Sequence, residues 1–241
     1  MRSFNKVFVI ALPRCATVSM CDALGVLGIR TAHLGRIYGE DTLEHNNPDR
    51  LRHMHDQITK KDFDFEILKQ CDGLADYPAC SFDVLRELDR AYPQSLFINV
   101  RRDRDIQRWL QSIERQFVGL QLLRAGEGKS ADDSSFMKTI LSFRKMTFGQ
   151  SDFEAEAYHR SYQDFQSRVK EFFSGRASML LSIADISELE TSGFRQICEF
   201  LECEVPISAF PRSNKHSELP SQFFMEALAA GQVESQTGIQ P

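Results

Sequence analysis

The sequence predicts an α/β protein with a mostly parallel central sheet flanked by helices. Three apolar runs of strand length, residues 7–12, 96–100 and 179–183, alternate with segments of helical periodicity. The runs are continuously apolar rather than alternating, which is typical of parallel strands covered on both faces. Ligands of such sheets bind beyond the carboxyl ends of the strands, so we expect the functional residues there.

The composition is that of an ordinary soluble globular protein, and we expect one domain over residues 1–241. The net charge of −5 argues against non-specific binding to nucleic acid. No apolar run reaches membrane-spanning length, and the N-terminus lacks the pattern of a signal peptide, so we expect a cytoplasmic protein without membrane association. The 6 cysteines form no CxxC pair, which favours reduced thiols that lie mostly in the core.

The first half of the chain begins with a strand, a tight turn and a helix that Gly28 ends. A short strand follows, then a loop-like stretch with a turn at residues 46–49. The expected elements are a strand at 7–12, a helix at 17–27, a strand at 29–33, helices at 51–58 and 62–70, a strand at 71–76 and a helix at 82–92 that Ser81 caps.

The second half begins with the strongest strand, residues 96–100, which leads into a long helix. Residues 127–135 form a polar, low-complexity stretch that predicts a surface loop, either a lid or a solvated linker. The other expected elements are helices at 136–148 and 153–173, a strand at 179–183, a helix at 194–201, an extended segment at 205–211 and a terminal helix at 220–230 within a 217–241 tail.

The turn after the first strand is an expected anion site. A strand that enters a helix through a tight turn directs several backbone N–H groups to one point, where the helix dipole adds positive charge. Arg14 adds a planar cation with five donors, and Thr17 and Ser19 add hydroxyl groups.

Two common nucleotide motifs are absent from this turn. The segment has no GxxxxGK[ST] pattern, since Arg14 stands where a lysine would and the turn has no glycine. It also has no GxGxxG pattern of a dinucleotide site. The sequence therefore disfavours ordinary ATP or GTP hydrolysis.

Polar residues follow three of the expected strands. Arg14 follows the first, Asp76 ends the strand at 71–76, and the cluster at 101–104 follows the strand at 96–100. Because parallel strands end at one edge of a sheet, we expect these groups to converge on one cleft.

Several segments together resemble PAPS-dependent sulfotransferases. LPRCATVS (12–19) resembles their 5′-phosphosulfate loop, in the lineage that commonly reads LPRTGTTS, and FINVRRDRDIQRWLQSI (97–113) resembles their 3′-phosphate segment. HLG (33–35), DYPA (76–79) and ICEFLECEVPISAFPRSN (197–214) are similar to the same lineage and follow in the same order. The resemblance implies a P-loop NTPase-like sulfotransferase fold and transfer of a sulfuryl group from PAPS to an acceptor, with release of PAP and without a metal.

The resemblance also implies roles for individual residues. Arg14 takes the place of the cation at the bridging oxygen of the phosphosulfate, and Ser112 that of the serine on the 3′-phosphate. The arginine that accompanies Ser112 is either Arg102 or Arg104, depending on whether one counts from the strand or from the serine. The other expected donor-binding residues are Cys15, Ala16, Thr17 and Val18 through their amides, Thr17 and Ser19 through their hydroxyls, and Arg212 as a further candidate for the 3′-phosphate.

Two residues of the loop depart from the family pattern. Ala16 replaces the usual glycine, so the turn either avoids a positive φ there or accepts strain. Val18 replaces a hydroxyl residue and removes one phosphate donor.

The acceptor needs a group that removes its proton. Asp76 is the first candidate because it ends a strand at the cleft, and His33 is the second. A carboxylate at this place also suits binding of a cationic acceptor without acting as a base. The expected acceptor is a small polar molecule, with a cationic secondary metabolite of a natural-product pathway as one form.

Two other functions stay open at this point. A nucleotide-dependent phosphotransferase on the same fold needs a magnesium-binding carboxylate, which Asp76 offers, and a loop lysine, which is missing. A non-catalytic nucleotide-binding protein would tolerate replacement of Arg14 and Asp76. Cys15 as a reactive thiol at a helix start, and His53 with His55 as metal ligands, are weaker hypotheses.

Overall fold

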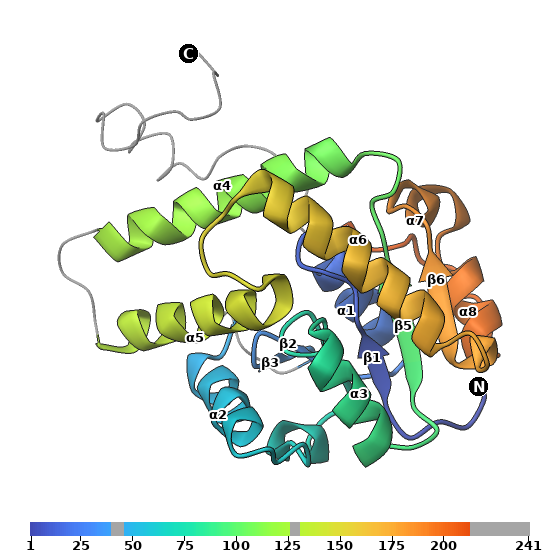
Figure 1. Cartoon of the computed structure of the whole chain (residues 1–241). Helices are drawn as coiled ribbons and strands as arrows, with labels where there is room; N and C mark the ends of the chain where they lie inside the picture. The colour runs from blue at the N-terminus through green and yellow to red at the C-terminus, as the bar shows by residue number, and fades with distance from the viewer. Residues whose placement is uncertain (40–45, 126–130, 213–241) are drawn as a thin grey trace.

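The computed structural model describes residues 1–39, 46–125 and 131–212, and its centre is a six-stranded sheet (Figure 1). The strand order is β3-β2-β4-β1-β5-β6. The strands are β1 (Val7–Val9), β2 (Thr31–His33), β3 (Arg36–Ile37), β4 (Gly73–Ala75), β5 (Leu96–Val100) and β6 (Leu180–Ile183). All neighbouring pairs are parallel except β2 and β3, which confirms the predicted fold class.

β1 lies in the middle of the sheet. Its Val7 pairs with Gly73 of β4 on one side and with Leu96 of β5 on the other. Every residue of β1, β4 and β5 is buried, as expected of parallel strands covered on both faces. The apolar run at β6 is different, because its two leucines are half-buried and Ser182 is exposed. This arrangement brings the carboxyl ends of β1, β2, β4 and β5 to the same edge.

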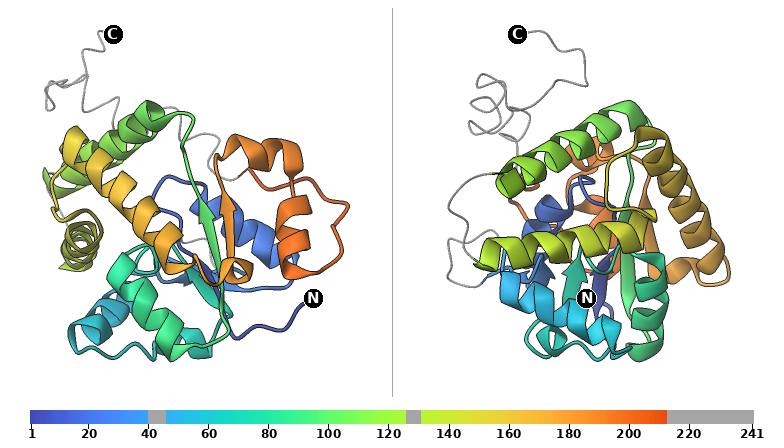
Figure 2. Two further views of the ribbon diagram at one scale, coloured as in Figure 1. Left: turned by 45° about the vertical axis from the view of Figure 1, so that its right-hand side comes forward. Right: turned by 60° about the vertical axis from the view of Figure 1, so that its left-hand side comes forward.

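Helices cover both faces of the sheet (Figures 1 and 2). Helix α1 lies on one face, where its Ala23 packs with Phe194 and Cys198 of the α8 region. Helices α3 and α6 lie in front of the sheet in Figure 1, and α4 and α5 extend this layer beyond the carboxyl edge. The helices are α1 (Thr17–Val26), α2 (Pro48–Thr59), α3 (Phe82–Ala91), α4 (Ile106–Ala125), α5 (Ala131–Phe148), α6 (Ala155–Phe172), α7 (Ser187–Ser192) and α8 (Arg195–Leu201), with 3-10 turns η1 (Glu66–Lys69) and η2 (Ala177–Met179).

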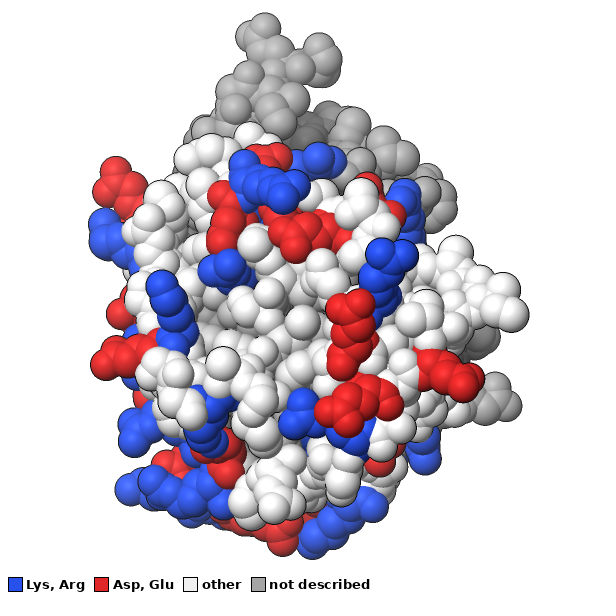
Figure 3. All heavy atoms as spheres, turned by 90° about the vertical axis from the view of Figure 1, so that its right-hand side faces the viewer, with Lys and Arg blue, Asp and Glu red and all other residues white. Residues whose placement is uncertain are grey.

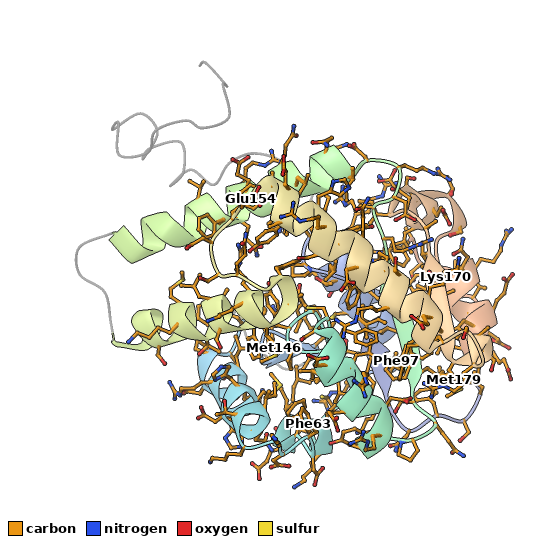
Figure 4. The ribbon with its side chains drawn as sticks, viewed as in Figure 1. Phe63, Phe97, Met146, Glu154, Lys170 and Met179 are labelled. Carbon is orange, nitrogen blue, oxygen red and sulfur yellow. The ribbon has the colours of Figure 1, made fainter. Side chains whose placement is uncertain are left out.

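The aromatic core is built around β5. The Phe97 ring lies 5.5 Å from that of Phe8 in β1 and 4.9 Å from that of Phe173 at the end of α6. Figure 4 shows Phe97 in the interior, whereas Glu154 marks the start of α6. Glu154 accepts hydrogen bonds from the backbone N–H groups of Glu156 and Ala157, which satisfies two donors at this helix start.

The helix predicted at residues 62–70 is wrong. Only η1 is helical there, because the buried Gln57 side chain competes for the backbone. Its amide donates to Asp64 O (3.1 Å) and to Asp62 Oδ2 (3.0 Å), and its oxygen accepts from Glu66 N (3.3 Å). These bonds hold an irregular connection between α2 and β4.

The predicted loop at 127–135 is also partly wrong, because α5 already begins at Ala131. Its remaining residues 127–130, and the terminal helix predicted at 220–230, lie outside the described residues. The sequence also missed two short elements, β3 and α7. The β2–β3 hairpin turns through Leu34 (φ 48°) and Gly35 (φ 80°), the left-handed pair that a two-residue hairpin needs.

Two further properties of the molecule are the charge pattern of one face and the hydropathy of its helices. On the face over β6, α7 and α8, positive and negative side chains alternate around a largely uncharged area (Figure 3), so this face carries no extended basic groove. Within the three described segments, we find no helix that is both long and apolar enough to cross a membrane.

Candidate functional site

The turn between β1 and α1 has the backbone of an anion site. Arg14 (φ 68°) and Ala16 (φ 58°) both adopt the left-handed conformation, and Thr17 then begins the right-handed helix. A change of hand between successive residues directs their N–H groups toward one concave point. The first N–H groups of α1 add to it, because the first turn of a helix has no intrahelical acceptors for them.

Three carbonyl groups in and around the turn accept hydrogen bonds from other groups of the protein. Leu12 O accepts from Cys15 N (3.1 Å), and Ala16 O accepts from Met20 N (3.0 Å). Pro13 O accepts from the indole Nε1 of Trp109 in α4 (2.9 Å), and the Trp109 side chain is fully buried. The turn is therefore fixed by both its own helix and α4. The Cys15 N–H, predicted as a ligand for the donor, is itself used in this turn and donates to Leu12 O.

Arg14 lies against α4. Its Nε donates to Ser112 Oγ over 2.9 Å, so the cation of the loop and the serine predicted for the 3′-phosphate lie next to each other. Burial lowers the pKa of Arg14, and the positive charges of Arg102 and Arg115 lower it further. The negative charge of Asp76 raises this pKa and offsets part of the shift. An arginine keeps its proton in proteins, so the group remains a cation. Three neighbouring cations and one carboxylate make a net positive site that favours an anion.

Thr17, Asp76 and His33 form a buried cluster at the ends of β1, β4 and β2. Thr17 Oγ1 donates to Asp76 Oδ2 (3.1 Å) and lies 3.2 Å from His33 Nε2. His33 Nε2 also lies 3.4 Å from Asp76 Oδ2. Because Thr17 has one hydroxyl proton and gives it to Asp76, the hydrogen-bond pattern assigns a proton to His33 Nε2. Sequence reasoning named all three residues, but assigned Thr17 to the phosphate rather than to this cluster.

The backbone fixes the Asp76 carboxylate. Asp76 has a positive φ of 63°, its N–H donates to Val9 O (3.3 Å), and its Oδ1 accepts from Tyr77 N (2.8 Å). A cis peptide bond joins Tyr77 to Pro78. Asp76 is only 5% exposed, yet three donors face its two oxygens. The protein itself therefore supplies hydrogen-bond donors to both carboxylate oxygens.

The two arginines that the sequence left as alternatives lie in different places. Arg102 Nε donates to Arg14 O (3.3 Å), which places Arg102 at the loop. Arg104 contacts Ser187 Oγ (3.5 Å) and Glu188 (3.7 Å) of α7. Arg212 also reaches α7, where its guanidinium lies 3.8 Å from Glu190.

The other predicted loop residues are part of the packed turn. Cys15 is fully buried and Ser19 is 7% exposed, whereas Val18 is half-buried. Burial raises the pKa of the Cys15 thiol to about 12. The thiol is therefore neutral at physiological pH, which excludes the reactive-thiol hypothesis.

His53 and His55, the weaker hypothesis of a metal site, contact different groups. His55 Nε2 lies 2.6 Å from Ser142 Oγ, whereas His53 faces Glu66 at 3.7 Å. In the described parts of the chain, no three His, Cys, Asp or Glu side chains are grouped as metal ligands would be.

Sequence reasoning missed two contributors to the site. Trp109 is one of them: a buried indole N–H needs an acceptor, and this requirement is a usable signal in the sequence. Arg115 was not considered, although it lies one helical turn after Ser112 and therefore on the same side of α4.

Comparisons with known proteins complete this picture. A family model described as "Sulfotransferase domain" matches residues 6–219. A curated protein of Aspergillus versicolor, "Ava biosynthesis cluster protein M", is 29% identical over 221 residues, which cover 86% of this chain and 79% of that protein. A crystal structure of a sulfotransferase from Alicyclobacillus acidocaldarius is similar at a TM-score of 0.45 and 14% identity, covering 95% of this chain and 92% of that one. We therefore assign the family from the match to residues 6–219 and not from the solved structure.

Proposed function

The chain belongs to the sulfotransferase family, and we propose that it transfers a sulfuryl group from PAPS to a hydroxyl or amine of a small-molecule acceptor, releasing PAP. The observation that carries the proposal is the contact between Arg14 and Ser112 beside the Thr17–Asp76–His33 cluster. It brings a cation for the donor and a base for the acceptor to the same strand ends. We further propose that residues 1–241 form one domain, since the family match extends over 6–219.

The residues suit an in-line transfer without a metal. The turn and the start of α1 would bind the 5′-phosphosulfate, and Arg14 would stabilise the negative charge that develops on the leaving phosphate as its bond to sulfur breaks. The acceptor oxygen or nitrogen forms the new bond to sulfur and gives its proton to Asp76. The Nε2–H of His33, 3.4 Å from Asp76 Oδ2, would orient this carboxylate for the transfer.

A relative gives a hint about the biological setting. The Aspergillus versicolor protein is named for a biosynthesis cluster, which supports an acceptor from secondary metabolism for this chain. The acceptor of that protein is not assigned to this chain, because the two are only 29% identical.

The donor is tested by thermal shift with PAP, with ATP and magnesium, and with NAD. PAP without magnesium should raise the melting temperature, because a ligand that binds only the folded state stabilises it by mass action. Stabilisation by ATP with magnesium and none by PAP would favour the phosphotransferase alternative and overturn the proposal.

The roles of Arg14 and the base are tested by turnover. Arg14→Ala should lower turnover far more than PAP affinity, since the cation acts mainly on the charge that develops during transfer. An equal loss of both would make Arg14 a binding residue only.

Asp76→Asn should lower turnover by about 10²–10⁴-fold, the range of a lost general base, and His33→Gln by less. The reverse order would assign the base to His33. Full turnover in both Arg14→Ala and Asp76→Asn would support the non-catalytic alternative.

A further inference from the structure

Arg144 is a buried cation without an anionic partner. The residue lies in α5 and is 1% exposed. The groups that it contacts are neutral: Tyr158 Oη at 3.5 Å, Gln116 Oε1 at 3.1 Å, and the ring of Phe117 at 5.5 Å from its Cζ. Within the described residues, no carboxylate lies at ion-pair distance from Arg144, and its Nε has no hydrogen-bond partner. An uncompensated buried charge is costly, so it needs a functional reason.

Tyr77 supplies a second unpaired donor close to Arg144. Its ring stacks on Phe143, the residue before Arg144, with centroids 5.6 Å apart and planes at 11°. Its Oη is buried and has no hydrogen-bond partner among the described residues. Burial raises the pKa of Tyr77 well above its ordinary value, while the charge of Arg144 opposes the shift, so the hydroxyl keeps its proton. Two unpaired donors with a positive charge suit an anionic oxygen ligand.

The two donors are connected to the transfer site on both sides. Tyr77 directly follows Asp76, the proposed base. On α4, Ser112 touches Arg14 and Gln116 touches Arg144, and these two residues are one helical turn apart on one side of the helix. Arg115 lies between them in sequence, and its charge acts on Arg14. Ser112 and Gln116 of α4 thus link Arg14 of the turn to Arg144 of α5.

We propose that Tyr77 and Arg144 bind a negatively charged group of the acceptor, such as a carboxylate, while the acceptor's hydroxyl lies at Asp76. The proposal rests on the proposed sulfotransfer. The half-exposed Gln116 amide oxygen, 3.1 Å from Arg144, occupies the position that the carboxylate takes when it binds. The acceptor is then an acidic hydroxy or amino compound rather than the cationic one that Asp76 alone suggested. Asp76 needs no cationic ligand, since Thr17 and Tyr77 N already donate to it.

The charge of the acceptor is tested with two phenols of opposite charge. The protein, saturated with PAP, is titrated with 4-hydroxyphenylacetate and with tyramine, which carry a carboxylate and an ammonium group at the same distance from the hydroxyl. The acid should raise the melting temperature by several degrees, and the amine should not. A larger shift with tyramine, or no shift with either compound, overturns the inference. A failure of PAP itself to stabilise the protein would instead overturn the proposed function.

Two variants separate binding from structure. Tyr77→Phe and Arg144→Met remove the unpaired donors, so the free variants should melt no lower than the wild type. Both should lose most of the shift caused by 4-hydroxyphenylacetate and keep the shift caused by PAP. Tyr92→Phe is the matched control, because its hydroxyl donates to Asp64 (3.1 Å) away from the site. Tyr92→Phe should have a lower melting temperature than the wild type and keep the shift caused by 4-hydroxyphenylacetate.

A lowered melting temperature of Tyr77→Phe with an unchanged acid shift would make Tyr77 a structural residue and contradict the inference. If Arg144→Met does not fold, the result for Tyr77→Phe decides alone.

Discussion

Ala16 carries a backbone conformation that alanine disfavours. Its φ of 58° and ψ of 26° lie in the left-handed region, where the Cβ of an L-residue costs roughly 1–2 kcal/mol. From the sequence, we expected the turn either to avoid a positive φ at Ala16 or to accept the strain. The positive φ is present, so the turn is strained here. Because the N–H groups of the loop depend on this conformation, the strain is located where the donor would bind.

Replacing Ala16 with glycine should therefore stabilise the protein. The relief of the left-handed conformation outweighs the greater chain entropy of glycine, so we expect a gain of about 0.5–1 kcal/mol in the free energy of unfolding. Urea denaturation of Ala16→Gly measures this gain in the free energy of unfolding. Ala16→Val is the control with the opposite expected sign, since a β-branched residue fits the left-handed conformation poorly. A loss of stability in Ala16→Gly would show that the turn is not strained.

Residue types at strand ends were enough to name three residues that the structure brings to one edge of the sheet. His33 ends β2, Asp76 directly follows β4, and Arg14 lies in the turn after β1. The bond from Thr17 to Asp76 was not predictable, because it depends on the side-chain direction at the first residue of α1. Arg144 was not predictable either, because its isolation among neutral groups depends on how α4, α5 and α6 pack.

Strand β4 depends on a glycine at its point of closest approach to β1. A Cβ on Gly73 would lie 1.7 Å from Val7 O, which is far inside any normal contact. Gly73 is also the residue that pairs with both Val7 and Thr31. The centre of the sheet therefore requires a residue without a side chain here.

Gly73→Ala should be strongly destabilising, by about 3 kcal/mol or more, because a rigid backbone oxygen cannot move out of the way. Gly25→Ala is the matched control within α1, where a Cβ would meet nothing within 4 Å. It should raise stability by roughly 1 kcal/mol, since alanine is the better helix former. Similar melting temperatures for the two variants would contradict this account of the β1–β4 pair.

Periodicity predicted the long elements well and the irregular ones poorly. The runs at β1, β5 and β6 are apolar except for Asn99 and Ser182, so their strands were clear. Residues 62–70 have a helical pattern as well, but the hydrogen bonds of Gln57 decide their structure, and a local pattern contains no information about them. The three-residue and two-residue strands β2 and β3 are too short for periodicity to set their ends.

The stability of the whole molecule should depend on pH through Asp185. This residue ties the β6–α7 connection to the end of β5, where it pairs with Arg102. Burial alone would raise the pKa of Asp185, but hydrogen bonds from Ser187 and Arg104 N and the charge of Arg102 outweigh it and lower the pKa below its ordinary value. The bonds from Ser187 N and Arg104 N measure 2.9 and 3.3 Å.

A lowered pKa in the folded state sets the direction of the effect. The stabilisation by ionised Asp185 is complete above the ordinary carboxyl pKa of about 4 and is lost as the pH falls through the lower pKa of the folded state. Asp185→Asn should be less stable than the wild type at pH 7, and the difference should shrink on acidification. Urea midpoints from pH 6 to pH 3 measure this, and parallel curves for the two proteins would contradict it.

The strand order also determines when the site can form during synthesis. Val7 starts the central strand, but its partners Gly73 and Leu96 come much later in the chain. Pairing across such separations is slow, because long loops must close before any contact compensates for their entropy. While the ribosome makes the first part of the chain, β1 has both edges unpaired and its apolar side chains unburied. The nascent chain therefore exposes this apolar strand until residues 96–100 emerge, and the turn that follows β1 takes its final shape only then.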